Sequence, residues 1–164
     1  MNVNQLLVLV FVLVAATGCG QSGDATKPVA SKPVITASSK TGEFGPQGLF
    51  DAAQPGWHSA QPPNYPESLT LDFGSPRQVK LIGLLGQDGQ PARAARALRI
   101  ESSNDGKAWT AVGGSENACA TNKPDGWFDV DLANSITTQH LRIVIFSNCG
   151  DAKLLTIRGL RVVE

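Results

Sequence analysis

The chain has 164 residues, enough for one domain of ordinary size together with some targeting or linker sequence. Its 14 basic and 14 acidic side chains give a formal charge of zero, and no run of lysine and arginine offers a path for a phosphate backbone. Length and charge therefore exclude two full domains and argue against nucleic acid as a partner.

The first apolar run covers residues 6–16 and is about half as long as a helix that crosses a membrane. A run of this length at the N-terminus, ending in small residues, is typical of a secretory signal peptide. We therefore expect residues 1–18 to form a signal peptide that is absent from the mature domain.

The residues that follow, Ala16-Thr17-Gly18-Cys19, resemble a bacterial lipobox. This resemblance implies that Cys19 is the lipid attachment site, and several acyl chains on one residue anchor a protein firmly to a membrane. Gly20 after the cysteine, by the sorting rule of Gram-negative lipoproteins, implies the outer membrane. The alternative is an ordinary secreted protein cut near the same place, which shares the exported location.

Residues 19–33 are small, polar and proline-containing, so we expect a flexible tether between the lipid and the domain. From residue 34 onward, short apolar runs are separated by Gly, Pro, Asn and Asp, which is typical of many short strands. We expect a single domain over residues 34–164.

Seven runs in this region have strand spacing, and no stretch keeps helical spacing for three turns. They cover residues 68–73, 78–84, 95–102, 109–112, 127–132, 139–146 and 154–163. The pattern predicts an all-β domain of two packed antiparallel sheets with seven or eight strands.

Two cysteines remain once Cys19 carries lipid, and an exported pair is expected to form a disulfide between Cys119 and Cys149. A cysteine metal site has little support, since no partner residue lies at ligand spacing. Because the Cα atoms of bridged cysteines lie within about 7 Å of each other, the bridge would also bring Trp127 and Asn148 near each other.

The segment Ser103-Asn104-Asp105-Gly106-Lys107-Ala108-Trp109 is a strong hairpin signal, because Asp-Gly supplies the positive φ of a tight turn. It resembles the S-x-D-G-x-x-W hairpin of the discoidin family, also called F5/8 type C or galactose-binding-like, which includes carbohydrate-binding modules of family 32. Further segments resemble the family in the same order: residues 49–51, 57–59, 65–74, 140–143 and 157–162. The resemblance implies a jelly-roll β-sandwich of about eight antiparallel strands with its binding loops at one end.

Family members often hold a structural Ca²⁺ between the opening loop and the final strand, and Asp51 and Glu164 stand at the matching positions. The resemblance thus implies a calcium site formed by these two carboxylates. The alternative is that Asp51 caps its own loop through backbone hydrogen bonds.

The resemblance also implies a ligand site. Arg93 and Arg96 lie in a loop that often supplies arginines to the ligand, and we group them with His58 and Asn148. Trp127 follows a loop and is either a stacking platform for a sugar or a buried residue, whereas Trp57 and Trp109 are expected in the core. The loop at residues 147–152 lacks the aromatic residue of many galactose binders, so no preference for galactose follows.

Catalysis has little support, because the chain has no GxSxG or HExxH motif and its close acidic pair, Asp129 and Asp131, is typical of a solvated strand face. The leading hypothesis is a non-catalytic envelope lipoprotein whose domain binds carbohydrate. The alternative is a structural or protein-interaction lipoprotein that uses the same fold without binding glycans. Phospholipid binding is weaker, since no loop shows a cluster of exposed apolar residues.

Overall fold

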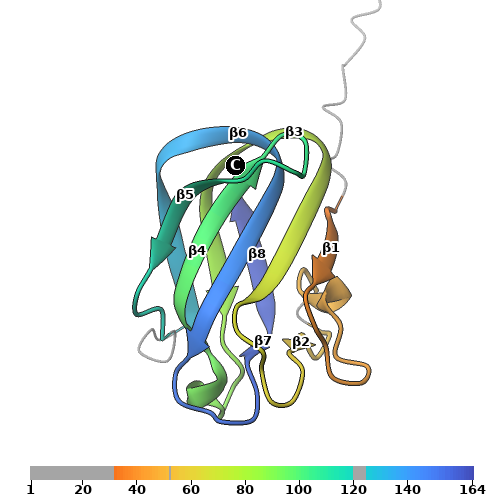
Figure 1. Ribbon diagram of the computed structural model, residues 1–164, viewed down its shortest axis with the longest axis vertical. Helices are drawn as coiled ribbons and strands as arrows, with labels where there is room; N and C mark the ends of the chain where they lie inside the picture. The colour runs from red at the N-terminus through yellow and green to blue at the C-terminus, as the bar shows by residue number, and fades with distance from the viewer. Residues whose placement is uncertain (1–31, 52, 120–124) are drawn as a thin grey trace, which may run out of the picture. The chain divides into compact units, whose positions relative to one another are not determined.

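The computed structural model describes residues 32–164, apart from residue 52 and residues 120–124. The expected signal peptide, Cys19 and most of the tether lie outside the described residues. The described part contains eight strands and two short 3-10 helices (Figure 1). In chain order these are β1 (Val34–Ala37), η1 (Pro46–Gly48), β2 (Trp57–His58), β3 (Glu67–Leu85), η2 (Pro91–Arg93), β4 (Ala95–Ser103), β5 (Thr110–Ser115), β6 (Trp127–Asn148), β7 (Thr156–Ile157) and β8 (Gly159–Val163).

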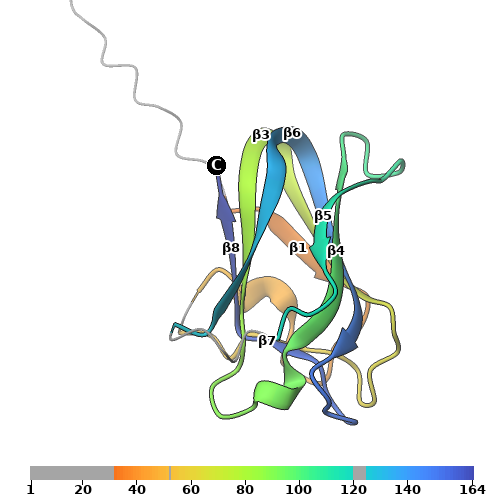
Figure 2. The ribbon, with the colours of Figure 1, turned by 90° about the vertical axis from the view of Figure 1, so that its left-hand side faces the viewer.

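The long strands β3 and β6 each contribute to both layers of a sandwich. In the larger layer, the first half of β3 and the second half of β6 lie between β1 on one side and β4 and β5 on the other. In the smaller layer, the other halves of β3 and β6 pair with each other, and β8 pairs with β3. Figure 2 shows both long strands bending over at one end of the domain. All of these pairs are antiparallel, and a separate β2–β7 pair lies at the other end.

The bend in β3 has a local cause in its sequence. Gly74 has a φ of +73°, which favours glycine, and its N–H donates to Asp72 Oδ1 at 2.8 Å. Pro76 follows and has no N–H for the ladder. The pairing with β6 accordingly breaks between Asp72 and Arg77, and the strand passes from one layer to the other.

The core lies between the layers and comes from alternate positions of the strands. Leu69, Leu71 and Phe73 of β3 pack with Leu141 of β6, and all four are at most 2% exposed. The smaller layer adds Ile82, Leu84, Val130 and Leu160 to the same core. The predicted all-β antiparallel sandwich is therefore confirmed.

The boundaries of several predicted strands were wrong. The runs at residues 68–73 and 78–84 are parts of one strand, β3, and those at 127–132 and 139–146 are parts of β6. Both strands continue through their bends. An interruption in the alternation of apolar and polar residues therefore did not mark the end of a strand. The strands β1 and β2 were not predicted, because four and two residues are too few for an alternating pattern. The only helices in the described residues are the two three-residue 3-10 turns, and no helix there could cross a membrane.

Candidate functional site

Four connecting segments meet at the end of the sandwich opposite the bends of β3 and β6, beside β2 and β7 (Figure 1). They are the loops after β1, after β2, before β4 and after β6, and we call this surface the loop end. Backbone hydrogen bonds join them: His58 N–H donates to Phe44 O at 3.2 Å, Ser59 N–H to Leu155 O at 3.0 Å, and Asp151 N–H to Ala92 O at 3.1 Å. The loop end is thus a connected surface built from distant parts of the sequence.

A pair of stacked rings forms one side of the loop end. The rings of Phe44 and His58 are nearly parallel, at an interplanar angle of 7° with centroids 4.1 Å apart. Phe44 is 36% exposed, whereas His58 is 9% exposed. Burial, and then the charge of Arg93, lower the pKa of His58 below its ordinary 6.5. The imidazole is therefore neutral at physiological pH, with one donor and one acceptor nitrogen.

Arg93, at the end of η2, is held by a carboxylate from another loop. Its Nε donates to Asp151 Oδ2 at 3.1 Å. The other oxygen of Asp151 accepts from the N–H groups of Lys153 at 2.7 Å and Leu154 at 2.9 Å. These two backbone hydrogen bonds are the main reason that the pKa of Asp151 is lowered, and Arg93 adds to the effect. Within the described residues the terminal amino groups of Arg93 have no hydrogen-bond acceptor, so they are available to a ligand.

Asn148 shapes the loop after β6. Its Nδ2 donates to the carbonyls of Asp151 at 2.6 Å and Leu154 at 2.9 Å, and its Oδ1 accepts from Gly150 N–H at 3.0 Å. The side chain thereby positions Asp151, which in turn holds Arg93. A direct contact of Asn148 with a ligand stays a prediction.

Tyr65 is a further polar group near this network. Its hydroxyl is buried and has no hydrogen-bond partner among the described residues. Burial raises the pKa of Tyr65 to about 12, with contributions from the charges of Glu67 and Asp151, while the nearby backbone of Asn148 offsets part of the rise. The phenol is therefore protonated and has a free proton to donate.

Phe44 and Tyr65 were not identified from the sequence. A signal existed for Phe44, because it lies in a glycine-rich segment, residues 42–48, where an aromatic ring has little to pack against. No comparable signal marked Tyr65, since its position depends on how residues 59–66 meet the loop after β6.

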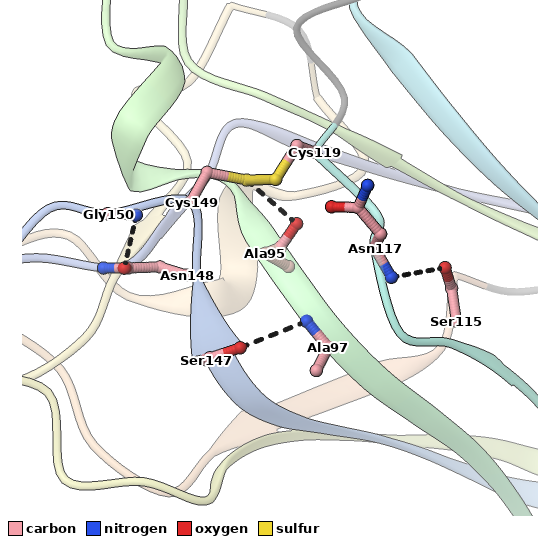
Figure 3. Close-up of a disulfide and its surroundings, with 9 residues drawn as sticks. All are labelled: Ala95, Ala97, Ser115, Asn117, Cys119, Ser147, Asn148, Cys149 and Gly150. Carbon is pink, nitrogen blue, oxygen red and sulfur yellow. Dashed lines mark hydrogen bonds between the residues drawn. A yellow bond between two sulfur atoms is a disulfide. The ribbon is translucent and has the colours of Figure 1, made fainter.

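The disulfide between Cys119 and Cys149 is present, with Cα atoms 5.8 Å apart (Figure 3). Cys149 directly follows Asn148, and its N–H donates to Ala94 O at 2.9 Å. The bridge thus joins the segment after β5 to the loop after β6, as the cysteine count predicts.

Two residues that the sequence grouped with this site have other neighbours. Arg96 is exposed on β4, where its carbonyl accepts from Ala118 N–H at 2.6 Å. Trp127 begins β6 in the smaller layer and pairs with Leu85, whereas Asn148 pairs with Ala95 in the larger layer. The Trp127 ring is half-buried, and the Arg161 guanidinium carbon lies 4.5 Å from its centroid.

The expectation that the disulfide brings Trp127 beside Asn148 was therefore wrong. Trp127 lies eight positions after Cys119, and an extended chain of that length spans about 26 Å. This is enough for the chain to pass from the bridge to the other layer.

The other two tryptophans differ from each other. Trp57 is fully buried, and its Nε1 donates to Ser39 O at 2.8 Å. Trp109 lies outside the core, half-buried, with the Arg142 guanidinium carbon 4.2 Å from its ring centroid. The expectation of a core position is confirmed for Trp57 and was wrong for Trp109, which precedes the edge strand β5.

The two carboxylates expected to bind Ca²⁺ have separate partners. Asp51 Oδ1 accepts from Ala53 N–H at 3.0 Å, which is the loop-capping alternative. Glu164 directly follows the C-terminal end of β8, and its carboxylate pairs with Arg77 at 3.3 Å. Among the described residues no three His, Cys, Asp or Glu side chains gather as metal ligands. This arrangement does not fit a shared site for an ion that takes six to eight oxygen ligands, and calcium binding stays a prediction.

Comparison with known proteins identifies the sandwich. A model of the F5/8 type C domain family matches residues 34–158. Among curated proteins, no significant match is found.

Several solved structures have the same fold and align with most of the chain. "CpGH89CBM32-5" from Clostridium perfringens, in complex with GalNAc-β-1,3-galactose, has a TM-score of 0.64 at 19% identity over 80% of this chain and 95% of that chain. Chitosan-binding module 1 of a chitosanase/glucanase from Paenibacillus sp. IK-5 has a TM-score of 0.66 at 23% identity over 82% and 97%. The CBM32 of AlyQ, in complex with 4,5-unsaturated mannuronic acid, has a TM-score of 0.65 at 16% identity over 82% and 96%.

Proposed function

Because the chain belongs to the F5/8 type C domain family, we propose that it is a non-catalytic module that binds a saccharide at the loop end. The observation that carries the proposal is the meeting of an exposed Phe44 ring, a neutral His58 and the Arg93 guanidinium on one surface. An aromatic face suits the apolar C–H face of a sugar, and the other two groups suit its hydroxyls. Solved structures of the same fold with bound saccharides support this choice of ligand.

The loop end is also preorganised for such a ligand. Asp151 holds Arg93, and Asn148 holds the loop that carries Asp151. The Cys119–Cys149 bridge restrains the same loop. Groups that are already fixed lose little conformational entropy when a ligand binds, which favours affinity.

A glycan array followed by titration calorimetry tests the proposal. We expect saturable binding to at least one glycan, and we expect Arg93→Ala to weaken it about tenfold or more, since charge-assisted hydrogen bonds are lost. Arg96→Ala is the matched control, because Arg96 is an exposed arginine without a contact to this network. Silence across a broad array would overturn the proposal and favour a structural or protein-interaction role.

We further propose that the module works outside the cytoplasm, at the bacterial envelope. In this proposal, lipid on Cys19 anchors it to the outer membrane. The support is the lipobox-like sequence at residues 16–19 and the apolar run before it. An oxidised cysteine pair in the domain agrees with an exported location.

A further inference from the structure

The outer face of the larger layer carries a row of five side chains remote from the core. The row begins at Trp109 and continues through Arg142, Glu101 and Arg99 to Phe146. The Arg142 guanidinium carbon lies 4.2 Å from the Trp109 centroid, and that of Arg99 lies 5.2 Å from the Phe146 centroid. We call this set the surface row.

Glu101 makes the row rigid. Its Oε2 accepts from Arg142 Nε at 2.7 Å, and its Oε1 accepts from Arg99 Nε at 2.8 Å. The Glu101 side chain is only 7% exposed, whereas that of Arg99 is 47% exposed. Arg99 is therefore fixed in place but open to solvent, and Phe146 beside it is 42% exposed.

A groove of about 450 Å³ lies beside the Phe146 end of the row, over the paired strands β4 and β5. Arg99, Phe146 and the exposed Glu116 line it, together with Gly113 and Gly114 of β5. A Cβ on Gly114 would lie 2.6 Å from Leu98 O, and one on Gly113 would lie 2.9 Å from Leu132 Cδ2. Gly113 faces the core at Leu132, whereas Gly114 shares the outer face with its partner Arg99 and accepts no side chain without a shift. The main chain of the edge strand is therefore left uncovered along the groove at Gly114.

The groove and the loop end are neighbours on the same strand. Phe146 precedes Asn148 by two residues on β6, which corresponds to about 7 Å along a strand. A chain-like ligand seated at the loop end can therefore continue along this face.

The groups in the groove suit a neutral sugar. Phe146 offers an aromatic surface, the Arg99 guanidinium donates hydrogen bonds, and the Glu116 carboxylate accepts them. Arg99 and Glu116 also balance each other in charge, so the groove has no strong preference for an anion. We propose that this groove is a second saccharide subsite, which binds a further unit of a glycan held at the loop end; the ligand class rests on the proposed function.

Titration calorimetry with oligosaccharides of increasing length tests the subsite. The probes are the neutral β-1,4-linked N-acetylglucosamine and β-1,4-linked galactose oligomers of one to six units. In the series that binds, we expect affinity to rise with length. Phe146→Ala and Glu116→Gln should each weaken binding of the six-unit oligomer about fivefold, while single-unit binding stays unchanged. Val34→Ala is the control, because Val34 is an exposed apolar residue, at 69%, on the opposite edge of the same layer.

Backbone amide NMR signals of Gly113 and Gly114 provide a second readout, and they should shift only with the longer oligomers. Equal six-unit affinity for wild type and Phe146→Ala, or unmoved glycine signals, would overturn the subsite alone. No binding to any oligomer, with the array also silent, would overturn the proposed function and the subsite together. Unchanged melting temperatures of the variants establish that they are folded.

Discussion

His58 shows how the environment of one side chain sets its chemistry. Its backbone joins the loop after β1, since its N–H donates to Phe44 and its carbonyl accepts from Thr41 N–H at 3.1 Å. Its ring is covered by Phe44 and lies in the field of Arg93. Both influences disfavour the imidazolium, so the folded domain keeps this residue neutral.

The stability of the domain should therefore depend on pH through His58. Because the folded pKa is lowered from 6.5, the unfolded chain takes up this proton at higher pH than the folded chain. The contribution of His58 to the free energy of unfolding is thus complete above the unfolded pKa and is lost as the pH falls through the folded pKa. We expect urea unfolding to show a smaller loss of stability between about pH 7 and pH 5 for His58→Gln than for wild type. Equal slopes of stability against pH for wild type and His58→Gln would contradict the assignment.

At the scale of elements, the loop after β6 depends on several independent restraints. Asn148 and Asp151 cap it internally, Arg93 ties it to η2, and the disulfide ties it to the segment after β5. Asn148 and Cys149 belong to or adjoin the strand itself. The rest of the loop is held by the hydrogen bonds of Asp151 within the loop and by the contact with Arg93 of η2.

Removing the disulfide should reveal how much of this order it supplies. The bridge closes a loop with a sequence separation of 30 residues, and the chain-entropy estimate for such a loop is about 3 to 4 kcal/mol. We expect the double variant Cys119→Ser, Cys149→Ser to have a free energy of unfolding lower by that amount, measured by urea denaturation. Mass spectrometry of the non-reduced, alkylated wild type should find the crosslinked peptide. Identical unfolding midpoints for the two proteins would show that the bridge adds no stability.

At the scale of the whole molecule, a short N-terminal segment and a β-sandwich carry different parts of the proposed role. The first 31 residues lie outside the described structure and include the expected signal peptide and Cys19. The sandwich provides the loop end and the surface row. Attachment and recognition are therefore expected to be separable.

Substitution of the lipid site tests this separation. We expect Cys19→Ser to abolish membrane association in cell fractionation while the sandwich remains folded, because the substituted residue precedes the first strand of the sandwich in the sequence. Metabolic labelling with a palmitate analogue should mark the wild type and not the variant. An unlabelled wild-type protein would refute the lipid anchor.

The sequence alone determined the fold class and the disulfide. Alternation at Leu69, Leu71 and Phe73 is a local property that fixes which face is buried, and counting cysteines requires no geometry. The family resemblance also grouped His58 with Arg93, and the structure places Arg93 close enough for its charge to lower the pKa of His58.

Only the tertiary structure decided which side chains share a surface. Phe44, Tyr65 and Asp151 come from three different loops, and their approach depends on how those loops meet. Trp127 lies in the other layer from Asn148, because a chain that extends eight positions beyond Cys119 can reach either layer. Trp109 lies outside the core because it precedes an edge strand. Strand patterns record burial within a few residues, whereas contacts between loops depend on the closure of the whole sandwich.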